Sequence, residues 1–191
     1  MFPASDIRLA VALATVDELP PAERERVDAE RRASRLAARR AVARVTRQAP
    51  PLDLRPRWQL PPVGHSTVSI SLTHCEGRAA AVAAPAGVRV GIDLERLTDM
   101  PRSHARYFLT VRERRSSVAL PLVALWTMKE AAWKAIGAGP DARFHELELQ
   151  LDRTERMRAA LFRGVRYQAA ADVSTPWPGF IMTAVRLGDP Q

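Results

Sequence analysis

Two carboxylates stand two residues apart in an otherwise apolar segment of the chain. Asp93 and Glu95 lie in Val90-Gly-Ile-Asp-Leu-Glu-Arg96, and a β-strand, whose side chains alternate between its two faces, would place both on one side. Neighbouring carboxylates repel each other, and a shared divalent cation removes that repulsion. Oxygen ligands favour Mg²⁺, which keeps several waters and takes further ligands from substrate phosphate. On these residues alone, a strand edge whose acidic side chains face the solvent is the commoner explanation.

A second group of charged residues follows in Trp126-Thr-Met-Lys-Glu-Ala-Ala-Trp-Lys134. Of the 29 basic residues 27 are arginine, and both lysines, Lys129 and Lys134, fall in this segment. Glu130 and Lys134 are four residues apart, so a helix would place them on one face. A surface ion pair beside two core tryptophans is the ordinary explanation. The alternative is a third carboxylate for a metal site, with Lys134 holding a phosphate. The arginine bias favours this alternative, because a simple salt bridge could as easily use arginine.

These segments resemble the signature of the 4′-phosphopantetheinyl transferases. That signature reads Gly-(Ile/Val)-Asp-x-Glu and, further along, Trp-(Ser/Thr)-x-Lys-Glu-(Ala/Ser)-x-x-Lys. Two more segments resemble the same family: Ser71-Leu-Thr-His-Cys-Glu-Gly77, in which Thr73 replaces the family's second serine, and Arg106-Tyr-Phe-Leu-Thr-Val-Arg-Glu113 between the main motifs. The four segments fall in the family's order and span residues 71–134. Each is weak alone, and together they are specific.

The resemblance implies an enzyme that transfers the 4′-phosphopantetheine arm of coenzyme A to a serine of an acyl or peptidyl carrier protein. The reaction would depend on Mg²⁺, with Mn²⁺ as an alternative, and release 3′,5′-ADP. The implied metal ligands are Asp93, Glu95 and Glu130. Glu130, or a metal-bound water that it orients, would accept the proton of the carrier serine. Lys134 would stabilise the charge that grows on the transferred phosphoryl group.

The resemblance also implies a set of coenzyme A-binding residues: His74, Thr73, Arg39, Arg32, Lys134 and Lys129. His74 matches the family histidine that contacts the 3′-phosphate of coenzyme A, although packing is the ordinary role of a single histidine. Arg32 and Arg39 share a helix face with Arg35, and an arginine-bearing helix at this place holds nucleotide phosphates in the family. A solvated basic face explains these arginines equally well. Lys129 receives only a supporting role.

The elements that must position these residues follow from hydrophobic periodicity and from proline and glycine. The pattern of the first half predicts a strand over 7–16, a long helix over 22–48 and two more strands over 68–74 and 78–84. A proline-rich loop over 50–62 precedes the last two strands. The second half predicts a strand, two helices and three strands, over 88–95, 103–117, 121–137, 147–151, 165–173 and 180–187. Gly137 and Gly139-Pro140 mark the end of the helix over 121–137.

The repeated order predicts an α+β fold with a pseudo-twofold duplication of two α+β halves. Each half would be a small, mainly antiparallel sheet packed on a long helix. Residues 1–86 would form the half on the nucleotide-phosphate side, and residues 87–191 the half with the metal site and the catalytic helix. The single-chain, surfactin-type branch of the family has two such halves with the active site between them, whereas the other branch has half-size subunits that trimerise. A duplicated order within 191 residues therefore indicates the surfactin-type branch and a monomer.

Composition excludes several classes of protein. A hydrophobic content of 47% is typical of a globular chain, and one cysteine excludes an internal disulfide. The longest near-apolar run, 118–128, is too short to span a membrane. Because no basic region precedes the apolar run over 9–16, a secretory signal is disfavoured and we expect a cytoplasmic protein.

The formal charge of +8 favours an acidic partner. Under the resemblance that partner is the carrier protein, which presents an acidic helix. A nucleic-acid-binding protein using the arginine-rich helix is the rival, but the aromatic content of 6% is low and no recognition motif is evident. The rival also leaves the carboxylate motifs unexplained, so we expect no nucleic-acid partner. A third alternative is a family member that has lost activity and serves as a binding protein.

Overall fold

A three-stranded antiparallel sheet forms the N-terminal part of the structure, a computed structural model that describes residues 9–47, 68–115, 119–139 and 141–191. Its strands are β1 (Ala10–Thr15), β2 (Val68–Cys75) and β3 (Arg78–Pro85), with β3 in the centre. Helix α2 (Ala29–Thr46) packs on one face of this sheet through alanines at helical spacing. Because alanine is small, the helix lies close to strands that are themselves rich in alanine.

A five-stranded antiparallel sheet forms the C-terminal part, in the order β4-β8-β7-β6-β5. Its strands are β4 (Arg89–Arg96), β5 (Leu147–Leu151), β6 (Met157–Phe162), β7 (Val165–Ser174) and β8 (Phe180–Pro190). Helix α5 (Leu122–Ile136) packs across β4 and β8. It ends at Gly137, whose left-handed conformation has a φ of 71°. The predicted helix over 121–137 and its glycine stop are therefore confirmed.

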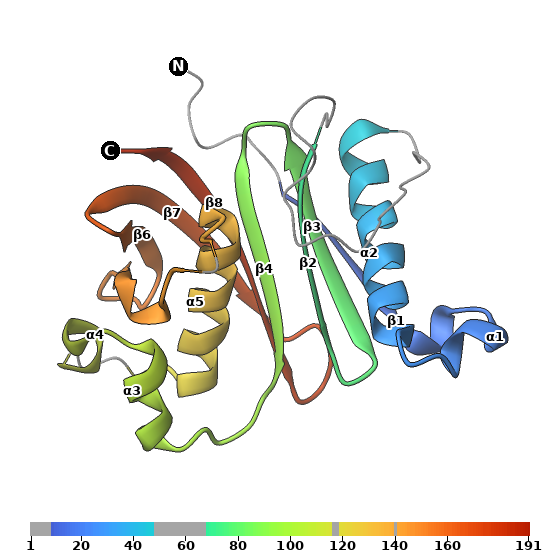
Figure 1. The fold of residues 1–191 in the computed structure, drawn as a ribbon, viewed down its shortest axis with the longest axis horizontal. Coiled ribbons are helices and arrows are strands. Elements are labelled where there is room, and N and C mark those ends of the chain that lie inside the picture. Colours follow the sequence, from blue (N-terminus) through green and yellow to red (C-terminus); the bar gives the residue numbers. More distant parts are fainter. Residues whose placement is uncertain (1–8, 48–67, 116–118, 140) are drawn as a thin grey trace.

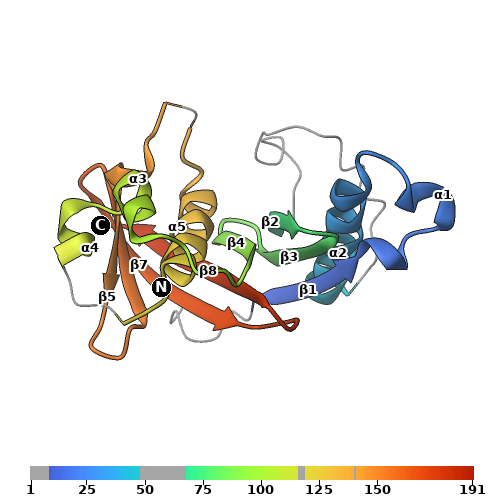
Figure 2. The same ribbon diagram turned by 90° about the horizontal axis from the view of Figure 1, so that it is seen from below.

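The first sheet and β4, the edge strand of the second, lie between α2 and α5 (Figure 1), and Figure 2 shows β4 between α5 and the first sheet. Alternate residues of β3, β4 and β8 form an apolar layer between the sheets, which includes Ala80, Val82, Ala84, Ile92, Leu94, Phe180 and Met182. At the edge, the backbone amides of Ile92 and Leu94 donate hydrogen bonds to the hydroxyls of Ser71 and Thr73, each at 3.2 Å. Side chains, rather than a shared backbone ladder, therefore join β2 to β4.

The fold is mixed α+β, as predicted, and each sheet packs on one long helix. The sheets differ in size, with three and five strands. The pseudo-twofold relation between the halves stays a prediction. None of the described helices has the length and apolarity that a membrane-spanning segment needs.

Two predicted helices differ from the structure. The helix over 22–48 is split into α1 (Pro21–Arg24) and α2, with a turn between them. The prediction of a single helix over 103–117 is wrong. A 3₁₀ turn, η2 (Arg102–His104), leads into α3 (Ala105–Phe108), and a separate helix α4 (Val111–Arg115) follows. The cause of the second break is local. Thr110 and Glu113 exchange backbone-to-side-chain hydrogen bonds, which begin a new helix after the extended Leu109.

Strand β6 is absent from the predictions. Its sequence, Met157-Arg-Ala-Ala-Leu-Phe162, contains adjacent alanines, which are depleted in strands, and it lacks strict alternation. Some predictions fall outside the described residues: the start of the first strand at 7–8, the end of the first long helix at 48, and the proline-rich loop. The same holds for residues 116–117 of the second predicted helix and for Pro140.

Candidate functional site

The carboxylates predicted to bind metal come together where α5 crosses β4. Gly91 allows this approach, because a Cβ at residue 91 would overlap the carbonyl oxygen of Ala131 and lie 2.8 Å from the amide nitrogen of Ala135. Two strand residues beyond Gly91, Asp93 extends toward the same helix. One oxygen from each of Asp93, Glu95 and Glu130 lies within 4.8 Å of the other two. The close packing of strand and helix thus builds a three-carboxylate cluster.

Asp93 is the most buried member of this cluster, with 2% of its surface exposed. Its Oδ1 accepts hydrogen bonds from Lys134 Nζ at 2.8 Å and from the Thr73 hydroxyl at 3.2 Å. Its Oδ2 is buried and has no hydrogen-bond partner among the described residues. Burial raises the pKa of Asp93, and the charge of Lys134 opposes that rise. An unpaired, buried carboxylate oxygen is costly, and a cation is the ligand that would satisfy it.

Glu95 and Glu130 complete the cluster from the strand and the helix. The indole nitrogen of Trp126 donates a hydrogen bond to Glu95 Oε1 at 2.8 Å. Burial raises the pKa of both glutamates, and neighbouring carboxylates add to the rise. The solvent-facing strand edge is therefore excluded as an account of Asp93. The donor set, all carboxylate oxygens with one unpaired, fits a hard divalent cation such as Mg²⁺.

Lys134 is the positive charge within this cluster. Its Nζ lies 2.8 Å from Asp93 Oδ1 and 3.3 Å from Glu130 Oε1, and it donates to the carbonyl oxygen of Ile92. Burial alone would lower the pKa of Lys134, but the two carboxylates raise it above its usual value. The ammonium is therefore held charged among the carboxylates, in reach of any anion that binds there.

His74 lies outside the carboxylate cluster, at the exposed end of β2. Its Nδ1 lies 3.1 Å from Glu30 Oε2 in the first turn of α2, and Glu30 Oε1 accepts a hydrogen bond from the Gly77 amide at 2.5 Å. Glu30 therefore fixes both the imidazole and the β2–β3 turn. Sequence reasoning missed Glu30, because nothing near it in the chain indicates this contact.

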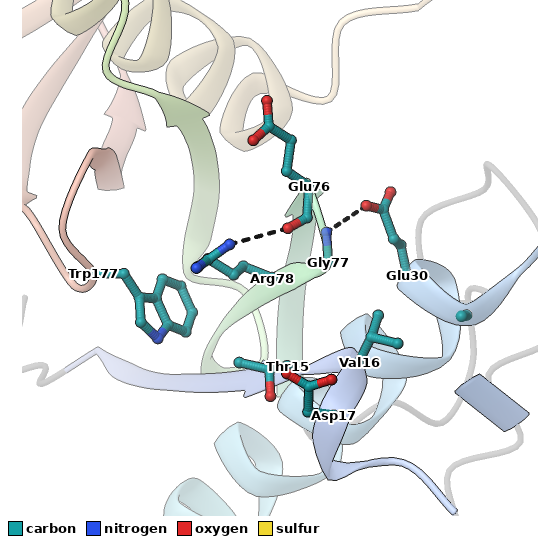
Figure 3. Close-up of a pocket in the computed structure, with 9 residues that line it drawn as sticks. Thr15, Val16, Asp17, Glu30, Glu76, Gly77, Arg78 and Trp177 are labelled. Carbon is teal, nitrogen blue, oxygen red and sulfur yellow. Dashed lines mark hydrogen bonds between the residues drawn. The ribbon is translucent and has the colours of Figure 1, made fainter. Parts of the chain in front are cut away.

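A hollow of about 470 Å³ opens beside Glu30. The end of β1, the start of α2, the β2–β3 turn and the β7–β8 loop surround it, with Thr15, Val16, Asp17, Ala29, Glu30, Glu76, Gly77, Arg78 and Trp177 as lining (Figure 3). Arg78 donates to the carbonyl oxygen of Glu76, and its guanidinium lies 4.3 Å from the centre of the Phe180 ring. The hollow thus combines carboxylates with one arginine and a tryptophan.

The predicted coenzyme-binding arginines lie on α2, apart from the carboxylates. Arg32 forms ion pairs with Asp28 at 3.1 Å and with Glu23 at 3.3 Å. Arg39 is exposed. The structure therefore does not bring these two side chains into the cluster, and their contact with a coenzyme stays a prediction.

Lys129 points into the protein interior. It has no exposed surface, and its Nζ donates to the Phe108 carbonyl and to Glu113 Oε2 at 2.7 Å. Burial lowers the pKa of Lys129, and Glu113 opposes this shift. Glu113 also accepts hydrogen bonds from the amides of Thr110 and Leu149. The contacts of Lys129 and Glu113 thus join α3, α4 and β5 to α5. They give no support to a role of Lys129 in coenzyme binding.

Comparison with known proteins gives a partial match. No curated protein matches the sequence. The crystal structure of Thermotoga maritima holo-[acyl-carrier-protein] synthase (AcpS) is similar over 53% of this chain and 64% of that chain, with 20% identity and a TM-score of 0.42. The match thus spans less than two thirds of that protein.

A family model, described as the 4′-phosphopantetheinyl transferase superfamily, matches residues 89–182. The matched segment contains both motifs that carry the candidate site, from Asp93 on β4 to Lys134 on α5. Residues 89–182, which include the three-carboxylate cluster, are therefore similar to the 4′-phosphopantetheinyl transferase superfamily.

Proposed function

We propose that the protein is a 4′-phosphopantetheinyl transferase of the holo-carrier-protein synthase type. It would transfer the phosphopantetheine arm of coenzyme A to a serine of an acyl or peptidyl carrier protein and release 3′,5′-ADP. One observation supports this above the others: the superfamily segment carries three carboxylates around Lys134, with the buried Asp93 Oδ2 lacking a partner. A solvated strand edge or a simple surface ion pair does not account for that arrangement.

In the proposed reaction the serine hydroxyl attacks the pantetheine-side phosphorus of the coenzyme diphosphate. A new bond forms between the serine oxygen and this phosphorus, and the bond to the 3′,5′-ADP oxygen breaks. Asp93, Glu95 and Glu130 would hold Mg²⁺, or Mn²⁺, which when bound supplies positive charge against the diphosphate. Glu130, or a water that it orients, accepts the serine proton. Lys134, a compact ammonium among the carboxylates, stabilises the charge on the transferred phosphoryl group.

Coenzyme A is proposed to bind toward the N-terminal half, residues 1–86, with the metal site and catalytic helix in residues 87–191. His74, whose Nδ1 lies 3.1 Å from Glu30, is the candidate for the 3′-phosphate, with Arg39 and Arg32 as further phosphate ligands. For Lys129 we propose a structural role instead, because it is buried against Glu113. The excess of positive charge supports an acidic carrier protein as the partner.

We propose a cytoplasmic monomer of the single-chain, surfactin-type branch, whose halves are related by a pseudo-twofold axis. The long helix on each sheet supports this branch.

Intact-mass spectrometry of an apo carrier protein tests the proposed reaction. The carrier is incubated with the protein, coenzyme A and Mg²⁺, beside an EDTA control and the variant Asp93→Ala. The expected result is a metal-dependent mass gain of one phosphopantetheine arm, absent with the variant. No gain on carriers from fatty-acid, polyketide and nonribosomal-peptide synthesis would contradict a transferase and favour an inactive coenzyme-binding protein.

A further inference from the structure

Thr73 places one hydroxyl between the two sheets and the carboxylate cluster. It lies on β2, is 7% exposed, and accepts a hydrogen bond from the Leu94 amide at 3.2 Å. It donates to Asp93 Oδ1, also at 3.2 Å. A hydroxyl carries a single proton. Since the Leu94 amide supplies the proton of the Leu94–Thr73 hydrogen bond, the hydroxyl proton of Thr73 remains available for the Asp93 carboxylate.

The second donor to Asp93 Oδ1 is Lys134, at 2.8 Å. Two donors from two different elements, β2 and α5, thus converge on one oxygen of a buried carboxylate. This convergence fixes the rotation of the carboxylate plane. The other oxygen, Oδ2, is then left buried and without a hydrogen-bond partner in the described part of the chain.

Ser71 offers an internal comparison. It lies two residues earlier on β2 and accepts a hydrogen bond from the Ile92 amide at 3.2 Å. Both hydroxyls therefore join the sheets in the same way and with the same distance. Within the described residues, only the Thr73 hydroxyl also bonds to a member of the carboxylate cluster.

We infer that Thr73 is a positioning residue for the cation site: through its hydroxyl, the N-terminal sheet orients Asp93 so that Oδ2 faces the cation. This inference rests on the proposed metal site. It differs from the coenzyme-binding role expected for Thr73, because a residue that orients a metal ligand acts on metal affinity, whereas a coenzyme ligand acts on the KM for coenzyme A.

Mn²⁺ binding to the metal-free full-length protein, followed by electron paramagnetic resonance without coenzyme, tests the inference. Thr73→Val keeps the side-chain shape and removes the hydroxyl, and is expected to weaken Mn²⁺ binding about tenfold or more, as hydrogen-bond partners of metal ligands do. Thr73→Ser, which restores the hydroxyl, should bind close to wild type. Ser71→Ala, which removes the matched inter-sheet bond, should leave Mn²⁺ affinity unchanged even where its melting temperature falls.

Steady-state kinetics separate the remaining roles. Thr73→Val is expected to need more Mg²⁺ for half-maximal rate, with an unchanged KM for coenzyme A at saturating Mg²⁺. If valine disturbs the fold, Thr73→Ala removes the same hydroxyl and repeats the comparison.

Three results would overturn the inference. Equal Mn²⁺ affinity in Thr73→Val and wild type would remove Thr73 from the site, and equal weakening by Ser71→Ala would reduce its role to joining the sheets. A raised KM for coenzyme A with unchanged Mn²⁺ binding would make it a coenzyme ligand. Failure of the wild-type protein to bind Mn²⁺ would instead reject the metal site of the proposed function, and this inference with it.

Discussion

Lys134 balances part of the negative charge that three neighbouring carboxylates place in the site. Its ammonium contacts Asp93 and Glu130 directly, at 2.8 and 3.3 Å. A cation and a phosphate would share this environment with it. The residue therefore affects both the stability of the metal-free protein and the proposed chemistry, and the two effects can be measured separately.

Lys134→Ala is expected to lower kcat about a hundredfold or more, with a smaller change in the KM for coenzyme A, because in the proposed reaction its charge acts on the transferred phosphoryl group. In EDTA the variant should also melt at a lower temperature than wild type, since the carboxylates lose their compensating charge. Mg²⁺ should then restore more of the melting temperature in the variant than in wild type. Steady-state kinetics and thermal melts measure these effects.

Arg153→Ala, which removes an exposed positive charge from the β5–β6 turn, is the control for the change in net charge. A Lys134→Ala protein with wild-type kcat and a raised KM would make Lys134 a binding group rather than a catalytic one.

Sequence spacing predicted which charged side chains lie together. Asp93 and Glu95 alternate on one strand, and Glu130 and Lys134 are one helical turn apart, so local geometry alone places each pair. Contacts that depend on the folded chain could not be found this way. The Thr73–Asp93 bond joins residues 20 positions apart, and the Gly77–Glu30 bond residues 47 apart; no local pattern specifies either.

The site depends on the crossing of α5 over β4. Gly91 is the contact point, because its missing side chain is what allows the backbone of α5 to approach. Helix and strand together bring Glu130 to Asp93, so any increase in their separation moves these carboxylates apart.

Gly91→Ala is therefore expected to destabilise the protein by about 1–3 kcal/mol, as overpacking does, and to weaken Mn²⁺ binding. Urea unfolding and metal titration measure the two effects. Gly139→Ala is the matched control, because a Cβ there would meet nothing within 4 Å and the backbone φ is ordinary. A Gly91→Ala protein with wild-type stability and Mn²⁺ affinity would show that the spacing of α5 and β4 tolerates a methyl group.

The turn between β5 and β6 is held by Asp152. Its carboxylate accepts hydrogen bonds from the hydroxyl and amide of Thr154, the Arg156 amide and the Arg158 guanidinium. These bonds, the Thr154 hydroxyl first, hold the pKa of Asp152 well below its usual value. Because the folded pKa lies below the unfolded one of about 3.9, the stabilisation is present above that pH and is lost as the pH falls.

Asp152→Asn should therefore lower the melting temperature at pH 7, and the difference from wild type should shrink as the pH falls below about 4. Thermal melts of both proteins across this pH range measure it. A difference that stays constant with pH would show that the hydrogen-bond geometry of the turn, and not the charge of Asp152, is responsible.

Helix α5 was predictable because Pro121 precedes it, Gly137 ends it and its apolar residues recur at helical spacing. The break in the segment 102–115 could not be predicted, because its composition suits a helix throughout. Only the reciprocal hydrogen bonds of Thr110 and Glu113 divide it. Hydrophobic periodicity indicates which face of an element is buried. It does not reveal a capping residue that ends one helix and begins another within a helical stretch.

The apolar layer between the sheets joins the two parts of the chain. One face of the first sheet is covered by α2, and β4 and β8 cover the other. Conversely, β3 covers the apolar side chains of β4 and β8, among them Ile92, Leu94, Phe180 and Met182. Each sheet therefore depends on the other to remove apolar surface from water.

The isolated segment 87–191 is therefore expected to self-associate, whereas the full chain is expected to be monomeric. Without the first sheet, the layer residues on β4 and β8 are exposed as one apolar patch. The amides of Ile92 and Leu94 also lose the Ser71 and Thr73 hydroxyls, which leaves β4 as an unpaired, apolar edge strand. Such edges pair with other chains. Light scattering coupled to size-exclusion chromatography measures the mass of both proteins. A monomeric segment with a cooperative melt would instead show that the C-terminal half folds independently, and that the layer between the sheets contributes little to its stability.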